Sequence, residues 1–172
     1  MLDYPLLNSS YDQSNNSITL WKDHNIGIAM DTPRGLIVPV IHKCQDKSIT
    51  DILDDLKRLK ALAQEQGTVP SEDLQGATIT LSNIGAIGAG TYMSPIVTAP
   101  QVAIGAMGKI QRLPRFVDNG ENSKSNVVEE VHVCNVSWGG DHRVIDGATM
   151  ARFHKQWKDY VEDPMKLIQD LK

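Results

Sequence analysis

The chain has 172 residues, 41% of them hydrophobic and 5% aromatic, which is enough to bury the mainly aliphatic core of a single domain. Its 21 acidic and 17 basic residues give a formal net charge of −4 without a basic block, so we expect small molecules or proteins as partners and no nucleic acid. No apolar run approaches the ~20 residues that cross a bilayer, and the first residues lack the sections of a signal peptide, so we expect no membrane association.

The first part of the chain predicts short strands separated by turns. Strand-like pieces lie around Ile18, at residues 26–30 and at residues 36–41, and the turn-forming segment DTPRG separates the last two. Pro39 lies inside the third piece, which predicts a strand edge or a bulge at that position.

The spacing of the apolar residues then changes to that of a helix. Ser48 is suited to cap a helix, with Asp51 three residues further on. Leucine and isoleucine then recur every three or four residues until Gly67. The sequence therefore predicts an amphipathic helix from residue 49 to just before Gly67.

The middle of the chain predicts a strand followed by a glycine-rich break. Residues 77–82 alternate between apolar and hydroxyl-bearing side chains, so Ser82 ends one face of a half-buried strand. The glycines of GAIGAG at residues 85–90 permit a close approach between this backbone and another group, which the sequence does not identify.

The last third predicts two strands and two helices. The strands are residues 101–110 and 127–138, and the polar segment 118–126 between them predicts a hairpin or a loose loop. A helix is expected from about Ala148 to Glu162, and Asp163 and Pro164 end it before a short helix over residues 165–172. Strands mixed with two substantial helices predict an α+β or mixed-sheet domain.

Metal and phosphate sites are poorly supported by residue spacing. His142 and Asp146 are four residues apart, but there is no HExxH motif, and His132 and Cys134 do not complete a ligand set. Cys134 and Cys44 form no CxxC pair, which is typical of a reducing compartment. The glycine-rich segment lacks the features of a phosphate-binding loop and is more typical of a turn or bulge.

Acid-base chemistry is the remaining interpretation of the segment DHRVIDGAT at residues 141–149. His142 has the right type of side chain to accept and return a proton, and the absence of a GxSxG motif favours direct attack by a substrate thiol or alcohol. Asp146 either locks the loop through a cation such as Arg143 or simply caps the following helix. Ser82 either donates a hydrogen bond to a developing oxyanion or is one more polar strand residue.

Two long segments resemble the catalytic domain of dihydrolipoamide acyltransferases, the core subunits of 2-oxo acid dehydrogenase complexes. They are LSNIGAIGAGTYMSPIVTAPQVAIGAMGKIQRLPRF and NVSWGGDHRVIDGATMARFHKQWKDYVEDP. The earlier segment HNIGIAMDTPRGLIVPV adds to the likeness, which covers nearly the whole chain and looks most like the branched-chain, mitochondrial branch. HxxxDG alone occurs in other coenzyme A acyltransferases, but its combination with the serine-bearing strand is specific.

The resemblance implies transfer of a branched-chain acyl group from a dihydrolipoyl thioester to coenzyme A. His142 would take the proton of the coenzyme A thiol, Ser82 would hydrogen-bond the oxyanion, and Asp146 would hold the active-site loop. A thiol with a pKa of about 8.5 needs only modest help from such a base. The implied contacts of coenzyme A are Asp31, Ser82, Asn83, Gly108 and Ile110.

The resemblance also implies a fold and an assembly. The fold is of the α/β (α+β) class, a two-layer mixed sheet with helices like that of chloramphenicol acetyltransferase, and residues 1–172 form one catalytic domain. Homotrimers, in which the histidine of one subunit faces the serine of its neighbour, would build a cubic core in the mitochondrial matrix. The implied partners are the lipoyl domain, which carries the lipoyl group, and the dehydrogenase/decarboxylase and dihydrolipoamide dehydrogenase subunits; no metal is implied.

The family's domain begins further upstream, so we expect this chain to lack its N-terminal part as well as a lipoyl and a subunit-binding domain. Two alternatives therefore stay open. One is a fragment that acts only in core assembly, and the other is an acyltransferase of the same fold that transfers acetyl or succinyl groups.

Overall fold

A mixed β-sheet forms the centre of the molecule. The computed structural model describes residues 1–66, 68–88, 90–117 and 127–170. The sheet contains β3 (Ile26–Thr32), β4 (Gly35–Ile37), β5 (Val40–Ile41), β6 (Ile79–Asn83), β7 (Ala103–Val117) and β8 (Val127–Gly140). In this part of the chain the strand order is β4-β3-β6-β7-β8, with β5 also paired to β3. The mixed sheet confirms the predicted fold class.

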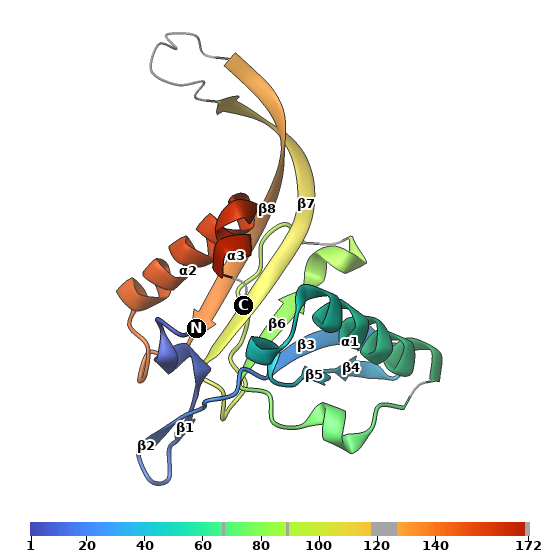
Figure 1. The fold of residues 1–172 in the computed structure, drawn as a ribbon, viewed down its shortest axis with the longest axis vertical. Coiled ribbons are helices and arrows are strands. Elements are labelled where there is room, and N and C mark those ends of the chain that lie inside the picture. Colours follow the sequence, from blue (N-terminus) through green and yellow to red (C-terminus); the bar gives the residue numbers. More distant parts are fainter. Residues whose placement is uncertain (67, 89, 118–126, 171–172) are drawn as a thin grey trace.

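The helical segments lie between and beside these strands. They are η1 (Pro5–Asn8), η2 (Cys44–Asp46), α1 (Ile49–Ala61), the π-helical turn η3 (Leu62–Gln66), η4 (Ser71–Leu74), η5 (Ile84–Ile87), α2 (Gly147–Glu162) and α3 (Pro164–Asp170). Figure 1 shows α1 over the β3, β4 and β5 end of the sheet and α2 with α3 beside β8. None of the described helices is both long and apolar enough to pass through a membrane.

Three neighbouring strands run in the same direction, which determines where side chains can gather. β3 is parallel to β6 and β6 is parallel to β7, whereas β8 returns antiparallel to β7. The carboxyl ends of β3 and β6 therefore lie at the same edge, beside the middle of the longer β7.

The predicted amphipathic helix is confirmed, including its first turn. Ser48 and Asp51 form a reciprocal capping box, in which each side chain accepts a hydrogen bond from the backbone N–H of the other residue. Leu59 on the inner face of α1 is completely buried. A bidentate pair between the exposed Arg58 and the buried Asp73 joins α1 to η4 and holds the pKa of that carboxyl below its usual value.

The strand predicted over residues 36–41 is divided in two. β4 ends at Ile37 and β5 begins at Val40, and the buried Pro39 lies between them. Proline has no N–H to donate to a ladder, but its carbonyl accepts a hydrogen bond from the N–H of Ile28 at 2.8 Å. The strand edge or bulge predicted at Pro39 is here a break between two short strands, and a single continuous strand over residues 36–41 was wrong.

β7 and β8 form a longer hairpin than the sequence predicts. β7 continues seven residues beyond the predicted end at Ile110, and β8 runs two residues beyond Trp138. Their register shifts between Met107 and Ile110, and the pair then rises beyond the other strands as a two-stranded ribbon (Figure 1). The hairpin or loose loop predicted over residues 118–126 lies outside the described residues.

Helix α2 packs its apolar face on the end of this hairpin. Phe153 is buried and lies edge-to-face against Trp138, with ring centroids 4.8 Å apart. The indole N–H of Trp138 donates to Nδ1 of His154 at 3.0 Å. Leu7 and Ile145 complete the core at this end of the molecule.

A small separate hairpin precedes the main sheet. It consists of β1 (Ser9–Asp12), which the sequence analysis missed, and β2 (Ser17–Leu20), which it anticipated around Ile18. The hairpin is tied to the loop before β7, because the N–H of Tyr11 donates to the carbonyl of Pro100 at 3.0 Å. Figure 1 places this hairpin near the start of α2.

Candidate functional site

Ser82 lies in a cleft on the sheet. This cleft has a volume of about 920 Å³, and Ser82, Thr80 and Ala29 are among the residues that line it. Ser82 is half-buried near the end of β6 and pairs with Ala29 on β3 and Ala106 on β7. A serine between two paired strands has a fixed backbone, so its hydroxyl is well placed to donate a hydrogen bond to a bound molecule.

The cleft also contains a polar pair that the sequence analysis did not single out. The hydroxyl of Thr80 donates to Oε1 of Gln101 at 2.8 Å. Thr80 was identifiable in principle, because the strand alternation puts it on the same face as Ser82. The sequence around Gln101 has no comparable pattern, because the loop before β7 brings this residue into the cleft.

The glycine-rich segment follows Ser82 and packs against β7. Asn83 caps η5 by accepting a hydrogen bond from the N–H of Ala86 at 3.2 Å. A Cβ added to Gly85 would lie 2.6 Å from the carbonyl oxygen of Gly108. Gly88 then ends η5 with a φ of 72°. The predicted close approach is thus an approach of backbone to backbone.

The residues predicted to contact coenzyme A gather at the same edge of the sheet. Asp31 lies two residues beyond Ala29, the partner of Ser82, and is exposed near the end of β3. Asn83 pairs with Met107, so Gly108 follows directly on the neighbouring strand. Gly108 is buried, and Ile110 beyond it is 69% exposed. Three parallel strands therefore bring the predicted set together.

His142 lies on a tight turn between β8 and α2, and its side chain is exposed. The turn begins where the N–H of Asp141 donates to the carbonyl of Val102 at 2.8 Å. The carbonyl of Asp141 then accepts hydrogen bonds from Val144 and Ile145, both at 2.9 Å. Ile145 is buried in the core, so the backbone that carries His142 is anchored on both sides.

Asp146 caps α2, which was one of the two roles considered for it. Its side chain accepts hydrogen bonds from the N–H and the hydroxyl of Thr149, both at 2.8 Å, and these lower the pKa of its carboxyl. The other role was to lock the loop through Arg143 or another cation, and Arg143 does not make that contact within this chain. Arg143 instead pairs with Asp141, with 2.6 Å between Nη2 and Oδ2, and lowers the pKa of that carboxyl.

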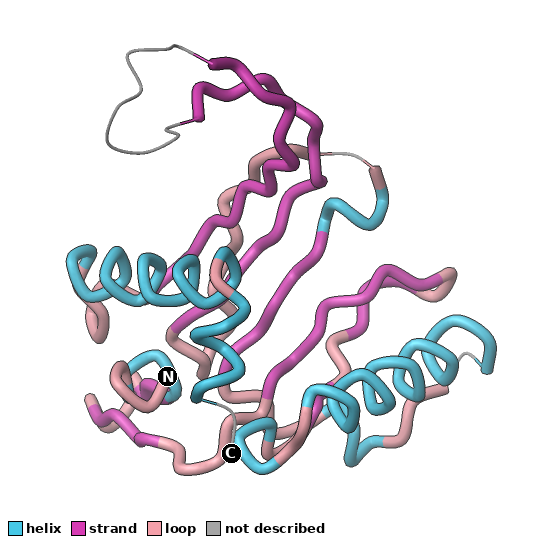
Figure 2. Tube along the Cα trace, turned by 45° about the horizontal axis from the view of Figure 1, so that its top comes forward, coloured by secondary structure: helices cyan, strands magenta, loops and turns pink. Residues whose placement is uncertain are grey.

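Ser82 and His142 lie far apart within one chain. Ser82 pairs with Ala106 of β7, whereas β8 ends at Gly140, which pairs with Ala103. At about 4.8 Å between strands and about 3.3 Å per residue, the Cα atoms of Ser82 and Gly140 are about 14 Å apart. Figures 1 and 2 agree that η5, which follows Ser82, and the start of α2 lie far from each other. Within one chain, the end of β8 that leads into the His142 turn therefore lies well away from Ser82.

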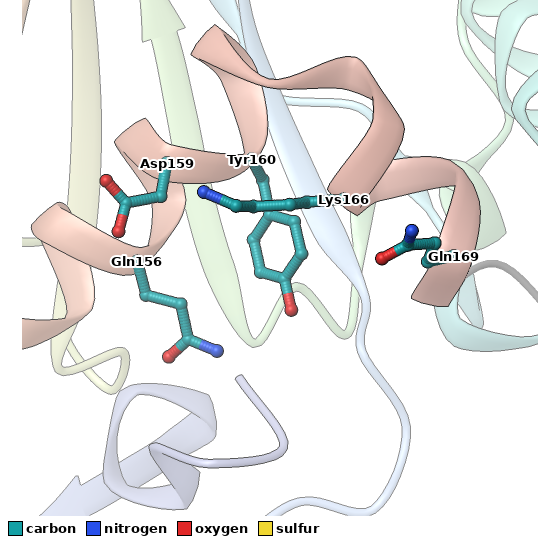
Figure 3. A pocket seen from close by; sticks show the side chains of 5 residues that line it. All are labelled: Gln156, Asp159, Tyr160, Lys166 and Gln169. Carbon is teal, nitrogen blue, oxygen red and sulfur yellow. The ribbon is translucent and has the colours of Figure 1, made fainter.

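A second, smaller pocket lies between α2 and α3. Its volume is about 210 Å³, and its lining is mostly polar: Gln156, Asp159, Tyr160, Lys166 and Gln169 (Figure 3). None of the predicted site residues is among them. Among the residues described here, no cluster of three or more histidine, cysteine or acidic side chains is arranged to hold a metal.

Comparison with known sequences gives one consistent family. The chain matches the 2-oxoacid dehydrogenases acyltransferase (catalytic domain) family over residues 1–169. It is 49% identical to the mitochondrial lipoamide acyltransferase component of the branched-chain alpha-keto acid dehydrogenase complex of Bos taurus, covering 100% of this chain and 34% of that protein. The protein of the same name from Caenorhabditis elegans is also 49% identical, with 100% and 37% covered. The chain thus spans about a third of the length of these curated relatives.

A more distant relative belongs to a different complex. The dihydrolipoyllysine-residue acetyltransferase component of the pyruvate dehydrogenase complex of Staphylococcus aureus (strain N315) is 36% identical, with 97% of this chain and 37% of that protein covered.

Solved structures show the same fold. The dihydrolipoamide acetyltransferase of Azotobacter vinelandii superimposes with a TM-score of 0.84 at 35% identity, covering 96% of this chain and 65% of that chain. The cubic core of the pyruvate dehydrogenase multienzyme complex gives a TM-score of 0.84 at 34% identity, with the same coverage. A chloramphenicol acetyltransferase gives 0.54 at 15% identity, with 92% and 70% covered, which supports the predicted likeness of fold alone.

Proposed function

Because the chain belongs to the acyltransferase (catalytic domain) family of the 2-oxoacid dehydrogenases, we propose that it transfers a branched-chain acyl group from a dihydrolipoyl thioester to coenzyme A. The observation that carries this proposal is the 49% identity over the full chain to lipoamide acyltransferase components of branched-chain complexes. The identity to the acetyltransferase component from Staphylococcus aureus is lower, at 36%, and this difference favours a branched-chain donor over an acetyl donor.

His142 acts as the general base in the proposed reaction. Its imidazole takes the proton of the coenzyme A thiol, and the resulting thiolate attacks the carbonyl carbon of the thioester. The tetrahedral intermediate then collapses, the bond to the dihydrolipoyl sulfur breaks, and the imidazolium returns its proton to that sulfur. The exposed position of His142 on an anchored turn supports this role, because the base must meet a substrate from solvent.

Ser82 stabilises the oxyanion of that intermediate. Its hydroxyl donates a hydrogen bond to the carbonyl oxygen as negative charge develops there. Its fixed place on β6, inside the cleft, supports the assignment. In the dihydrolipoamide acetyltransferase of Azotobacter vinelandii, a serine, a histidine and an asparagine four residues after the histidine were studied for their roles in catalysis. Ser82, His142 and Asp146 follow the same order, and the last two have the same spacing.

Coenzyme A binds along the edge where β3 and β6 end. Asp31, Asn83 and Gly108 lie side by side there on three neighbouring strands. The exposed Ile110 extends this surface along β7 and offers an apolar contact to the ligand. Ser82 lies on the same strands, so a thioester bound in the cleft reaches both the oxyanion donor and the coenzyme A thiol.

The working unit is an oligomer in which the cleft of one subunit receives the His142 turn of another. The distance of about 14 Å between Ser82 and the end of β8 supports an arrangement between chains over one within a chain. A homotrimer that assembles further into a cubic core, as in the pyruvate dehydrogenase complex of similar structure, satisfies this requirement.

The lipoyl group reaches the site on a separate domain. The other partners of this chain are the dehydrogenase/decarboxylase and dihydrolipoamide dehydrogenase subunits. The mitochondrial relatives support a location in the mitochondrial matrix.

Acyl transfer from a dihydrolipoamide thioester to coenzyme A tests the proposal. We expect the 172-residue chain to use isobutyryl-dihydrolipoamide in preference to the acetyl and succinyl thioesters, and His142→Ala to abolish turnover. Equal turnover by His142→Ala would refute the catalytic role of the histidine. A preference for acetyl would support the acetyltransferase alternative. Large particles that bind no coenzyme A would support a role in assembly alone.

A further inference from the structure

Arg143, next to the proposed general base, is held between two separate parts of the molecule. On one side its guanidinium makes a bidentate contact with Asp141, with Nε 2.9 Å from Oδ1 and Nη2 2.6 Å from Oδ2. On the other side its Cζ lies 4.3 Å from the centre of the Tyr11 ring, and Nη1 donates to Oε1 of Gln13 at 3.2 Å. Tyr11 belongs to the β1–β2 hairpin and Gln13 to its turn, so Arg143 connects this hairpin to the turn that carries His142.

The hairpin side of this connection is itself fixed in place. The hydroxyl of Tyr11 donates to Oδ1 of Asn16 at 2.9 Å, which orients the ring under the guanidinium. The backbone of β1 is joined to the loop before β7 by the bond from Tyr11 to Pro100 and by a bridge between Ser10 and Gln101. A planar guanidinium stacked on a ring and paired with a carboxylate has little freedom to move.

The turn side of the connection leaves His142 with little direct support. In the described part of the chain, the hydrogen bonds around the turn involve Asp141, Arg143, Val144 and Ile145, and none involves the imidazole of His142. The direction of the imidazole therefore depends on the backbone of residues 141–145. The N–H of Arg143 also donates to Oδ1 of Asp141 at 3.0 Å, so one carboxylate holds both the backbone and the side chain of Arg143.

We propose that Arg143 is a positioning residue, which uses the ring of Tyr11 and the carboxylate of Asp141 to hold the His142 turn in its reactive geometry. The β1–β2 hairpin is then a part of the catalytic apparatus that acts on His142 through Arg143. This inference rests on the proposed function of His142. A small displacement of a base costs turnover while leaving coenzyme A binding unchanged, because the proposed contacts of coenzyme A lie at the other end of the strands.

Steady-state kinetics of three variants test this proposal. Arg143→Gln removes the pair with Asp141 and the stacking on Tyr11. Tyr11→Leu removes the aromatic ring, and Tyr11→Phe keeps the ring but removes the hydroxyl. We expect kcat to fall about tenfold in the first two variants, with the KM for coenzyme A unchanged, and to be largely retained in Tyr11→Phe. Arg112→Gln is the matched control, because it removes an exposed arginine–carboxylate pair with Glu130 on the distant β7–β8 ribbon.

Hydrogen exchange provides a second measurement that does not depend on activity. The amides of Val144 and Ile145 are bonded to the carbonyl of Asp141, so their exchange reports directly on the turn. We expect faster exchange there in Arg143→Gln and no change in Arg112→Gln. Unchanged exchange, or a kcat equal to that of Arg112→Gln, would overturn the proposal. If the wild-type chain makes no product, the proposed function fails and the catalytic role of Arg143 fails with it, while the exchange data still decide whether Arg143 holds the turn.

Discussion

A hydroxyl on a paired strand is a more effective hydrogen-bond donor in catalysis than one on a loop. Its backbone is already fixed, so no reorganisation is needed when the oxyanion forms. Ser82 has such a position between β3 and β7. We expect Ser82→Ala to lower kcat by about 100-fold and to change the KM for coenzyme A far less, because Ser82 is only one of five proposed contacts of coenzyme A. Kinetics at saturating acyl donor measure both constants. An effect on KM alone would show that Ser82 binds substrate and does not stabilise the oxyanion.

Asp146 should contribute to stability in a pH-dependent way. The hydrogen bonds from Thr149 lower the pKa of its carboxyl in the folded protein, so the charged form stabilises α2. This contribution is complete above the ordinary carboxyl pKa and is lost as the pH falls through the lowered pKa of the folded state.

Thermal unfolding of two Asp146 variants measures this contribution. Asparagine is also a good cap but does not titrate. Asp146→Asn should therefore unfold at nearly the same temperature as wild type at neutral pH, and at a higher temperature than wild type below about pH 4. Asp146→Ala lacks the cap and should unfold at a lower temperature throughout the neutral range. Equal unfolding temperatures for the alanine variant and wild type would show that the cap adds nothing to stability.

At the scale of the elements, the contact between η5 and β7 requires glycine. A Cβ on Gly85 would lie 2.6 Å from a backbone carbonyl oxygen, and backbone yields less easily than a flexible side chain. We expect Gly85→Ala to lower the free energy of unfolding by roughly 1–3 kcal/mol. Gly147→Ala is the control, since no atom lies within 4 Å of its added Cβ, and it should be neutral or slightly stabilising. Urea unfolding of both variants makes the comparison, and similar midpoints would show that η5 moves away from β7 at little cost.

Local signals in the sequence predicted the elements well where the chain itself determines them. The capping box of Ser48, the interruption at Pro39 and the alternation before Ser82 each follow from residue chemistry within a few positions. β1 and the far half of β7 were missed for a different reason. β1 is held by the loop around Pro100, and residues beyond Ile110 are held by β8, so both depend on long-range pairing that local pattern does not encode.

At the scale of the whole molecule, the positions of Ser82 and His142 predict complementation between two inactive variants. A site formed between chains needs Ser82 from one chain and His142 from its neighbour, so mixed oligomers of Ser82→Ala and His142→Ala contain some intact sites. Random mixing in equal amounts should restore about a quarter of the wild-type activity in any cyclic oligomer. Co-expression or joint refolding followed by the acyl transfer assay measures this. Mixtures of Ser82→Ala with the double variant are the negative control, and no recovery in the first mixture would contradict a site formed between chains.

The candidate site was predictable as a list of residues but only partly as a geometry. The resemblance to a known family named Ser82, His142 and the residues near Gly108, and the parallel strands bring the last group together with Ser82. Arg143 was one of the cations considered as a partner of Asp146, and it pairs with Asp141 instead, because sequence spacing does not distinguish two nearby carboxylates. Asp141 is two residues from Arg143, and its side chain also accepts a hydrogen bond from the N–H of Arg143. The side chain of Asp146 instead accepts a hydrogen bond from Thr149.

The distance between Ser82 and the His142 turn also determines when activity begins. On the proposed arrangement between chains, a newly folded, unassembled chain carries both groups but no complete reaction centre, so we expect negligible turnover that rises only as subunits meet. The rate per chain therefore depends on concentration, and dilution below the dissociation constant of the oligomer should lower the specific activity even while each subunit stays folded. Under this proposal, assembly itself switches the activity on, and we expect unassembled subunits to leave the acyl donor unused.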